Sequence, residues 1–440
     1  MAINSHPSDR APGSGFFGSL CRALARSGPL KGLLPPTLKD RIRARLLRPA
    51  HRRLWSVKAG AAESLARHPA GVNLFGVLGE ADGIGEGGRS SERALAAAGI
   101  PVARVAVSEA ELHGPPLGPE RAAAARYALN WWHLTPGHDP LLVMALGAGP
   151  FLGRFNLGYW AWELEEFPTA WDDSYRYFGE IWTPSSFSRQ ALAARSPVPV
   201  TVVPHAVEAR PPERDWRTHF GLPRGRIAFL CMFDMASTAE RKNPCAAVRA
   251  FRRAAAGRDD ALLVVKARRA ESDPAAWRAL ERELAGLGAR VIAESLSREE
   301  SWGLLAACDA VISLHRAEGF GLVPAEAMAL GKPVVATGYS GNMDFMTEEN
   351  SLPVKFSMAR IERRVGPYPR GARWAEPDLE HAAALIREVL ERPDRARELG
   401  RRAAHDMAER FSPTAVGRIA RARLEELGFH FGGDRPDVQT

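Results

Sequence analysis

The feature that most constrains the fold of this 440-residue chain is an alternation of short apolar runs with amphipathic stretches that occurs twice. The first set covers residues 71–207, the second covers 225–412, and a Pro-rich segment at 208–224 separates them as a linker. Strands that alternate with helices in this way predict parallel sheets covered by helices on both faces. We therefore expect an α/β protein with two doubly wound, Rossmann-like domains that face each other across a cleft. Ligands of such domains bind at the carboxyl ends of the strands.

Apolar periodicity and helix-capping residues place the individual elements. The first set predicts strands at 72–78, 102–108, 141–146, 156–162, 180–185 and 200–207. The second set predicts strands at 227–233, 261–267, 290–295, 310–315 and 333–338. Helices are expected at 89–98, 244–256, 274–287, 297–308, 324–330, 378–392 and 395–411. The segment 413–440 is expected to form a C-terminal helix and tail that packs back on the first domain.

Positive charge is concentrated near the N-terminus. Eleven lysines and arginines lie between Arg22 and Lys58, against the single acid Asp40, whereas the net charge of the whole chain is +8. The remainder is therefore slightly acidic, which argues against a nucleic-acid-binding surface across the domains. Residues 1–70 are expected to form a basic, partly helical leader. Two hypotheses stay open: it docks on the protein as an arm, or residues 16–58 lie on an anionic membrane surface.

Several further features bear on the class of protein. No run of about 20 apolar residues occurs, so we expect no membrane-spanning helix. The N-terminus is polar and no apolar core of signal-peptide type follows it, which favours a cytoplasmic protein. If the leader binds lipid, the protein would be peripheral on the inner face of the plasma membrane. The four cysteines are expected to be reduced thiols: Cys21, Cys231, Cys245 and Cys308.

The stretch RAEGFGLVPAEAMALGKP, at 316–333, carries the clearest chemical signal. Glu318 follows an expected strand, and Gly319 and Gly321 let the backbone approach a ligand closely. The N-terminus of the next helix offers free N–H groups and the positive end of a dipole, which suit a diphosphate. Glu326 lies in the first turns of that helix. Two carboxylates beside an anion site suit a ligand with hydroxyls on both sides of its phosphates, as in a nucleotide-sugar.

Glu318 and Glu326 are separated by seven residues. This spacing resembles the Glu-x7-Glu signature of retaining GT-B glycosyltransferases, especially family 4. Five further segments resemble that family or, within it, bacterial cell-surface polysaccharide transferases: 331–350, 233–251, 156–171, 180–192 and 200–207. The resemblance covers about residues 71–425, and its motifs are most specific in the second domain.

The resemblance implies roles in donor binding for residues of the second domain. Glu326 would bind the donor ribose, Glu318 would contact the sugar hydroxyls, and Lys242 would neutralise the leaving diphosphate. Backbone N–H groups would hold sugar and phosphate oxygens at Gly319, Phe320, Gly321 and Leu322. The family usually has an arginine where this chain has Ser237, so Arg241 and Lys266 are the candidates for the second phosphate cation.

The Gly-rich segment at 82–89 is expected to be a loop that faces the diphosphate from the first domain, through Gly85 and Glu86. Its sequence also fits the dinucleotide-binding fingerprint GxGxxG, in which Glu109 would be the acidic residue further along the chain. The glycines of that fingerprint are Gly83, Gly85 and Gly88. A dehydrogenase therefore stays as an alternative, although the Glu-x7-Glu region has no place in one.

The acceptor chemistry must come from the first domain. The family often has a histidine where this chain has Trp162 and Glu163, so Glu163 and His133 are the candidate groups for the acceptor hydroxyl. His315 either orients the Glu318 loop or is a buried structural histidine. Six of the 11 tryptophans are candidates for stacking on a saccharide or for core packing: Trp131, Trp132, Trp160, Trp162, Trp171 and Trp182.

The expected function is that of a retaining glycosyltransferase of hexosyltransferase type. It would transfer a sugar from a nucleotide-sugar to a saccharide or lipid-linked saccharide in surface polysaccharide, such as lipopolysaccharide, biosynthesis. The resemblance implies front-face attack at the sugar carbon. We expect no metal and no cofactor, because basic side chains can stabilise the leaving diphosphate. A non-catalytic saccharide-binding protein and a nucleotide-sugar epimerase remain as alternatives.

Overall fold

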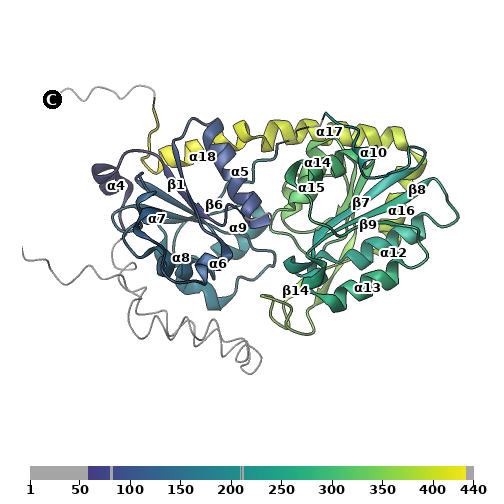
Figure 1. Ribbon diagram of the computed structural model, residues 1–440, viewed down its shortest axis with the longest axis horizontal. Helices are drawn as coiled ribbons and strands as arrows, with labels where there is room; N and C mark the ends of the chain where they lie inside the picture. Colours follow the sequence, from purple (N-terminus) through teal and green to yellow (C-terminus); the bar gives the residue numbers. More distant parts are fainter. Residues whose placement is uncertain (1–57, 80–82, 209, 211–212, 433–440) are drawn as a thin grey trace, which may run out of the picture.

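A computed structural model describes residues 58–79, 83–208, 210 and 213–432 of the chain. Two parallel six-stranded sheets, each flanked by helices, stand side by side and form two domains (Figure 1). The predicted α/β fold class is confirmed. Residues 1–57, which make up most of the predicted leader 1–70 and all but the last residue of the segment 16–58, lie outside the described residues.

The first sheet has the strand order β2-β1-β3-β4-β5-β6. Its strands are β1 (Val72–Gly76), β2 (Val102–Ala106), β3 (Leu129–His133), β4 (Phe155–Tyr159), β5 (Glu180–Thr183) and β6 (Val200–Val202). Its helices are α4 (Ala61–Arg67), α5 (Gly83–Ala97), α6 (Glu109–Leu112), α7 (Pro119–Ala123), α8 (Asp139–Leu146) and α9 (Ser186–Ala193), with the 3-10 helix η1 (Thr169–Tyr177). All strand pairs are parallel, so their carboxyl ends lie at one edge of the sheet.

The second sheet has the order β12-β11-β10-β7-β8-β9. Its strands are β7 (Ile227–Asp234), β8 (Ala261–Arg268), β9 (Arg290–Ile292), β10 (Ala310–Ser313), β11 (Val334–Thr337) and β12 (Leu352–Val354). Strand order reverses between the neighbours β7 and β10, and ligands of doubly wound sheets bind at such a switch point. An antiparallel hairpin follows, formed by β13 (Phe356–Arg360) and β14 (Arg373–Pro377).

Helices cover both faces of the second sheet. They are α10 (Trp216–His219), α11 (Ala239–Lys242), α12 (Pro244–Ala254), α13 (Pro274–Leu284), α14 (Arg298–Ala307), α15 (Leu322–Ala329), α16 (Leu379–Glu391) and α17 (Pro393–Phe411), with the 3-10 helices η2 (Met235–Ser237), η3 (Ala270–Ser272) and η4 (Gly341–Asp344). The expected capping box is present, because Ser297 and Glu300 exchange hydrogen bonds at the start of α14. Short α10 lies inside the segment predicted as a linker, and its Trp216 is buried.

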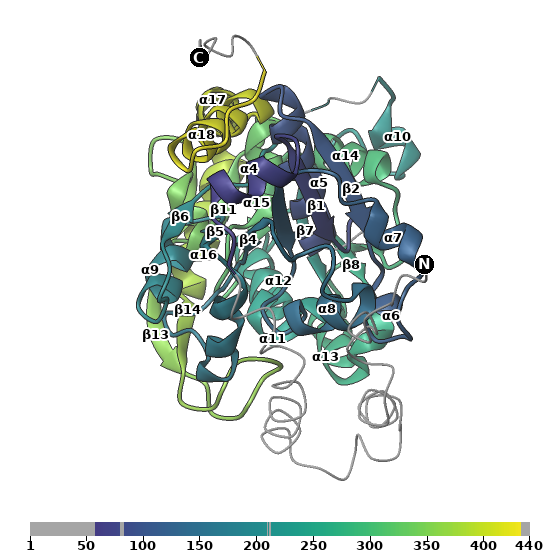
Figure 2. The same cartoon turned by 90° about the vertical axis from the view of Figure 1, so that its left-hand side faces the viewer.

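The chain crosses back to the first domain through its last helices. From α17, helix α18 (Pro413–Glu426) runs beside α5, as both views show (Figures 1 and 2). A Cβ at Gly417 would clash with the carbonyl oxygen of Ala94, so the glycine permits the two helices to approach this closely. Val416, Ala420 and Leu424 join the core of the first domain. The last helix of the chain thus stabilises the first domain.

Two local predictions in the first domain were wrong. The apolar run at 141–146 forms the buried helix α8 rather than a strand, because Pro140 suits the first turn of a helix and periodicity cannot separate a short buried helix from a strand. The segment at 82–89 is not a loop, since α5 begins at Gly83. A Cβ at Gly87 would lie 2.6 Å from the His205 ring and 2.7 Å from His133 Nε2, so this glycine serves close packing of the helix.

The described part of the chain contains no helix that combines the length and the apolar character needed to cross a membrane. Cys231, Cys245 and Cys308 are free thiols, and the first and third of them are buried. Cys21 lies outside the described residues.

Candidate active site

A cluster of opposite charges lies at the switch point between β7 and β10. Glu318 belongs to the loop after β10, and Arg241 and Lys242 come from α11, which follows β7. The Lys242 Nζ atom lies 2.6 Å from one Glu318 oxygen, and an Arg241 Nη atom lies 3.1 Å from the other. The parallel register brings these two loops to the same edge of the sheet, so the three side chains converge.

Neighbouring charges, more than burial, determine the ionisation of Glu318 and Arg241 in this cluster. Glu318 is buried, and burial alone would raise its pKa, but Lys242 and Arg241 lower the pKa to about 2. Desolvation likewise works against the charged Arg241, yet Tyr368, Glu318 and Glu163 hold its pKa above the ordinary value. Both groups are therefore ionised at neutral pH. Buried ions of this kind are retained only when they are paired and hydrogen-bonded.

The backbone around Glu318 is held by a second loop, which follows β11. Glu318 N–H donates to the Ser340 hydroxyl at 2.8 Å, and Gly341 N–H donates to Glu318 O at 2.9 Å. A Cβ at Gly341 would lie 2.8 Å from Phe320 N and closer still to Gly319 O. Only glycine fits here without displacing the Glu318 loop.

Helix α15 begins directly after this loop. Its N-cap is Gly321, whose φ of +97° lies in the left-handed region that favours glycine. The first N–H groups of any α-helix lack acceptors within that helix, so they and the helix dipole attract anions. Glu326 lies in the second turn of α15 and is buried. The start of α15 is therefore suited to a phosphate.

The first domain contacts the same loop directly. The Ser185 hydroxyl, at the N-cap of α9, donates to Gly319 O at 2.6 Å, and Ser188 Oγ lies 3.3 Å from the same oxygen. A Cβ at Gly319 would lie 3.2 Å from the Cβ of Ala161. The carboxyl edges of the two sheets thus meet at this glycine.

Glu163 approaches the cluster from the loop after β4. One of its oxygens lies 3.8 Å from Arg241, and the other accepts a hydrogen bond of 3.1 Å from the Tyr368 hydroxyl. Tyr368 is in the hairpin between β13 and β14, and its ring lies 5.5 Å from that of Trp162. The hairpin therefore links a carboxylate of the first domain to the charges of the second.

A second set of charges lies beside Glu326. The Arg298 guanidinium, at the start of α14, lies 2.7 Å from Glu326 and 3.0 Å from Glu86 of α5. Glu86 is also paired with Arg93 at 2.7 Å and with Arg89 at 3.0 Å. Burial opposes ionisation of Glu86, but Arg298 and Arg93 lower its pKa. Burial raises the pKa of Glu326, and Arg298 only partly opposes this.

Two histidines lie beneath α5 on the first-domain side. The His133 ring stacks on Tyr159 at 4.5 Å, and its centroid lies 5.9 Å from that of His205. Burial and His205 hold the pKa of His133 well below its ordinary value. Burial lowers the pKa of His205 to about 4. Both imidazoles are therefore neutral at pH 7, and His205 meets the Phe320 ring edge-on at 5.2 Å.

Comparison with known proteins identifies the family. Residues 185–418, more than half of the chain, match the model of a family described as "Family 4 Glycosyltransferase in conflict systems". The chain belongs to this family. The match includes Arg241, Lys242, Glu318 and Glu326, and a glycosyltransferase replaces the dehydrogenase alternative. No curated protein matches the chain in sequence.

Solved structures of glycosyltransferases share the two-domain architecture. Anabaena HepE in complex with UDP and glucose has a TM-score of 0.60 and 16% identity, covering 81% of this chain and 100% of that one. Sucrose-phosphate synthase from Thermosynechococcus elongatus has a TM-score of 0.58 and 17% identity, with 82% and 99% covered. A glycosyltransferase from Rickettsia africae has a TM-score of 0.58 and 14% identity, with 82% and 99% covered. At these identities the similarity establishes the GT-B fold.

The structure brings together most of the residues that the sequence predicted for donor and acceptor binding. Glu163, Arg241, Lys242 and Glu318 form one cluster, and Glu86 and Glu326 meet at Arg298. The backbone positions predicted for oxygen binding form the loop and first turn around Gly321. They are Gly319, Phe320, Gly321 and Leu322. Gly85 is buried in the first turn of α5, on the helix that carries Glu86.

Other predicted residues have different surroundings. Lys266 is buried and donates to Ala267 O at 2.8 Å, and burial lowers its pKa. The charges that influence Lys266 are Glu294, Arg268 and Asp234, not those around Glu318. Arg241 is thus better placed than Lys266 to supply the second cation. His315 is fully buried between Ser313 and Asn342, each at 3.0 Å, and so fixes the loop after β11 to β10.

The tryptophans of the first domain pack its core. Five of the six predicted candidates are at most 2% exposed, namely Trp131, Trp132, Trp160, Trp162 and Trp182. They contact one another and neighbouring tyrosine and phenylalanine rings. Core packing therefore explains these five, and only Trp171 is partly exposed.

Sequence reasoning did not single out Arg298, Tyr368, His205 or Ser185. The capping box at Ser297 marked the start of α14, and an arginine in a first helical turn is opposed by the helix dipole. This unfavourable position could have indicated from the sequence that Arg298 has a partner elsewhere. Tyr368 carried no signal, because the β13–β14 hairpin was not predicted. The contact of Ser185 with Gly319 depends on how the two domains meet, which a single sequence does not reveal.

A groove of about 700 Å³ lies elsewhere, where the chain crosses from the second domain to the first. Its lining comes from β6, α17, α18 and neighbouring residues, and includes Val202, Arg410 and Ile419. None of the residues of the two charged clusters lines it. The chemistry of the site therefore rests on the clusters and not on this groove.

Proposed function

We propose that this protein transfers a sugar, with retention of configuration, from a nucleotide-sugar to a saccharide or lipid-linked saccharide. The observation that carries the proposal is the convergence of Arg241 and Lys242 on Glu318, directly before the N-terminus of α15. This arrangement joins two cations, the N-terminus of a helix and a carboxylate that could accept hydrogen bonds from sugar hydroxyls. A nucleotide diphosphate sugar offers a partner to each of the three, since it carries both phosphates and hydroxyls.

The leaving diphosphate gains negative charge as its bond to the sugar breaks. Lys242, Arg241 and the start of α15 lie together and would stabilise that charge most strongly in the transition state. With these cations the reaction would need no metal ion. Glu318 would accept hydrogen bonds from sugar hydroxyls and Glu326 from the ribose. Attack of the acceptor on the face that the diphosphate leaves would give retention.

The acceptor would approach from the first domain. Glu163 lies in the loop after β4, 3.8 Å from Arg241, and would accept a hydrogen bond from the acceptor hydroxyl. His133 is neutral and could accept a proton, but it is only 4% exposed under α5 and an acceptor cannot reach it easily. Glu163 is therefore the better placed of the two to contact the acceptor hydroxyl. HepE, which shares the fold, has been crystallised with UDP and glucose, which supports a UDP-hexose as the first donor to test. We further propose a role in surface polysaccharide assembly, with the basic leader near lipid-linked acceptors.

Calorimetric titration with UDP-, GDP- and ADP-sugars tests the donor. We expect one nucleotide class to bind, and Glu326→Ala to lose at least tenfold in affinity, because a hydrogen bond to a charged group contributes about 1.5–3 kcal/mol. Glu348→Ala, which changes an exposed carboxylate, should bind normally. Folded protein that binds no nucleotide-sugar would refute the proposal.

Turnover separates the remaining possibilities. Proton NMR of the first product from an α-linked donor should show the α-anomer, and a β-anomer would rule out retention. Donor binding without hydrolysis or transfer would identify a saccharide-binding protein, and an epimerised nucleotide-sugar would identify an epimerase. Co-sedimentation with anionic vesicles, with and without residues 1–57, tests the leader. Equal partitioning of the two forms would remove the membrane role.

A further inference from the structure

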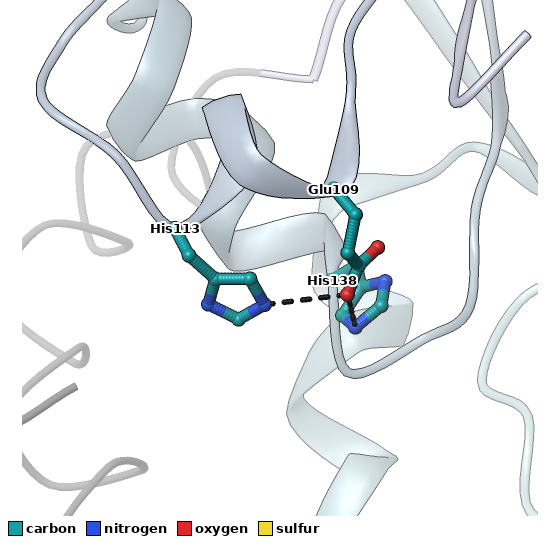
Figure 3. Close-up of side chains that lie close together, drawn as sticks. All are labelled: Glu109, His113 and His138. Carbon is teal, nitrogen blue, oxygen red and sulfur yellow. Dashed lines mark ion pairs between the residues drawn. The ribbon is translucent and has the colours of Figure 1, made fainter. Parts of the chain in front are cut away.

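Two histidines and a glutamate converge on the first domain, apart from the charged clusters (Figure 3). The His113 Nε2 atom lies 3.4 Å from a Glu109 oxygen, and the His138 Nε2 atom lies 3.6 Å from the same oxygen. One ligand atom from each residue lies within 4.8 Å of the other two. In the part of the chain that the structure describes, this is the one such group of three.

Local structure fixes the positions of these side chains. Glu109 and His113 are four residues apart at α6, so they point to the same side of the helical turn. A capping box between Ser108 and Glu111 begins α6. His138 comes directly before α8, where its carbonyl oxygen accepts from Leu141 N–H at 2.9 Å.

The two elements also pack against each other. Leu112 of α6 and Leu142 of α8 are both buried in the same hydrophobic core. Leu117 N–H, in the segment after α6, donates to Ala145 O of α8 at 2.7 Å. The backbone thus brings the ligand atoms together without a metal ion to hold them.

The spacing fits a tetrahedral metal ion. Ligand atoms about 2.0–2.1 Å from zinc at tetrahedral angles lie roughly 3.3 Å from each other. The two separations between imidazole nitrogen and carboxylate, 3.4 and 3.6 Å, are close to that value. Two imidazoles and one carboxylate are a known zinc ligand set that leaves the fourth position for water.

We propose that Glu109, His113 and His138 form a binding site for a divalent transition metal, with Zn²⁺ the ion that suits the ligands best. The site goes beyond the proposed sugar transfer, for which we propose no metal. It joins α6, after β2, to the start of α8, after β3, at the carboxyl edge of the first sheet. Metal binding would therefore stiffen this edge of the first domain.

The chain supplies a matched control. His405 and Glu409 are also four residues apart, and their Nε2 and Oε atoms lie 3.4 Å apart, as in the pair of His113 and Glu109. The pair on α17 is not part of any three-residue group among the described residues. The two pairs therefore differ in the third ligand, His138.

Titration of EDTA-treated, dialysed protein with ZnCl₂ tests the site. We expect wild type and His405→Ala to bind one more equivalent of Zn²⁺ than His113→Ala or His138→Ala, or to bind it at least tenfold more tightly. Because the readout is a difference between variants, zinc bound elsewhere on the chain does not affect it. Co²⁺ should give visible absorption bands of tetrahedral intensity in wild type, and these bands should be lost in His138→Ala.

In EDTA, His113→Ala and His405→Ala should unfold at the wild-type temperature, because those two side chains are exposed. His138 is only 24% exposed, so the effect of Zn²⁺ on His138→Ala is measured against the same variant in EDTA. Zn²⁺ should raise the unfolding temperature of wild type and His405→Ala only. Identical isotherms for wild type and His138→Ala would mean an adventitious ion only and would overturn the proposal.

Discussion

The guanidinium of Arg298 lies 2.7 Å from the carboxylate of Glu326. The same group contacts Glu86 of α5 at 3.0 Å, so one arginine of the second domain joins buried carboxylates from both domains. Arg298 also lies over the Trp302 ring at 4.5 Å, which fixes its orientation. Two buried carboxylates would repel each other without this shared cation. The Glu326 carboxylate therefore depends on Arg298 for its charge as well as for its position.

Replacement of Arg298 by alanine should destabilise the protein by about 1–2 kcal/mol at pH 7.5. The loss is smaller than for a fully buried pair, because the Arg298 side chain is 39% exposed and solvent screens it. It should shrink toward pH 5, because burial raises the pKa of Glu326 and protonation of that carboxyl removes its repulsion with Glu86. Urea unfolding at both pH values measures this. Arg401→Ala, which breaks an exposed pair, should change little, and an Arg298→Ala loss that grows on acidification would contradict the pairing.

Glu318→Gln should change the response of the protein to acid. The folded-state pKa of Glu318 is about 2, below the ordinary value of 4.5, so its ion pairs stabilise the protein above pH 4.5. That stabilisation, up to about 3 kcal/mol, is lost as pH falls from 4.5 toward 2. Glu318→Gln lacks the contribution, so its unfolding free energy should fall less steeply over this range. Glu348→Gln serves as the control, and equal slopes for all three proteins would argue against the depressed pKa.

Lys242→Ala should lower turnover by about a hundredfold, with a smaller effect on KM, if Lys242 stabilises the departing diphosphate. The prediction rests on the proposed transfer reaction and on the position of Lys242, 2.6 Å from Glu318. Steady-state hydrolysis or transfer of the donor identified by calorimetry measures both constants. Lys355→Ala, an exposed position on the same domain, should behave like wild type. An effect confined to KM would assign Lys242 to ground-state binding alone.

Gly341→Ala should disturb the Glu318 loop without touching any charge. The new Cβ would lie 2.8 Å from Phe320 N and closer to Gly319 O, so the two loops must separate. We expect a loss of about 2 kcal/mol in stability together with weaker donor binding. Gly225→Ala is the matched control, because nothing lies within 4 Å of a Cβ there. Normal donor affinity in Gly341→Ala would show that the loop tolerates the shift.

The second domain was largely predictable because its signals are local. Strands 227–233 and 261–267 are apolar runs bounded by polar turns, and they match β7 and β8 within a residue or two. Glu318 and the glycines after it are close together in the sequence and directly precede the start of one helix. Local patterns of this kind can predict a ligand-binding loop, because consecutive backbone residues form it.

What sequence reasoning missed depends on contacts between distant segments. The 82–89 segment looked like a loop because its glycines are flexible in isolation, yet the helix α5 begins at Gly83, and Gly87 lets this helix pack closely against His133 and His205. Similarly, Glu109 and His113 are visible as a helical pair, but His138 comes from another element. Tertiary packing brings such groups together, and periodicity carries no information about it.

Asp139 offers a test of that packing. Its side chain is fully buried at the first residue of α8, in the core of the first domain, and burial raises its pKa well above the ordinary value. A raised pKa means that the folded protein holds the proton, so stability falls as pH rises above about 4, by up to about 1.4 kcal/mol per unit. Asp139→Asn should lack this slope, and its stability relative to wild type should increase between pH 5 and 8 in urea unfolding. Asp259→Asn, at an exposed site, should follow wild type. A constant difference between Asp139→Asn and wild type across that range would mean that Asp139 is ionised in the folded protein.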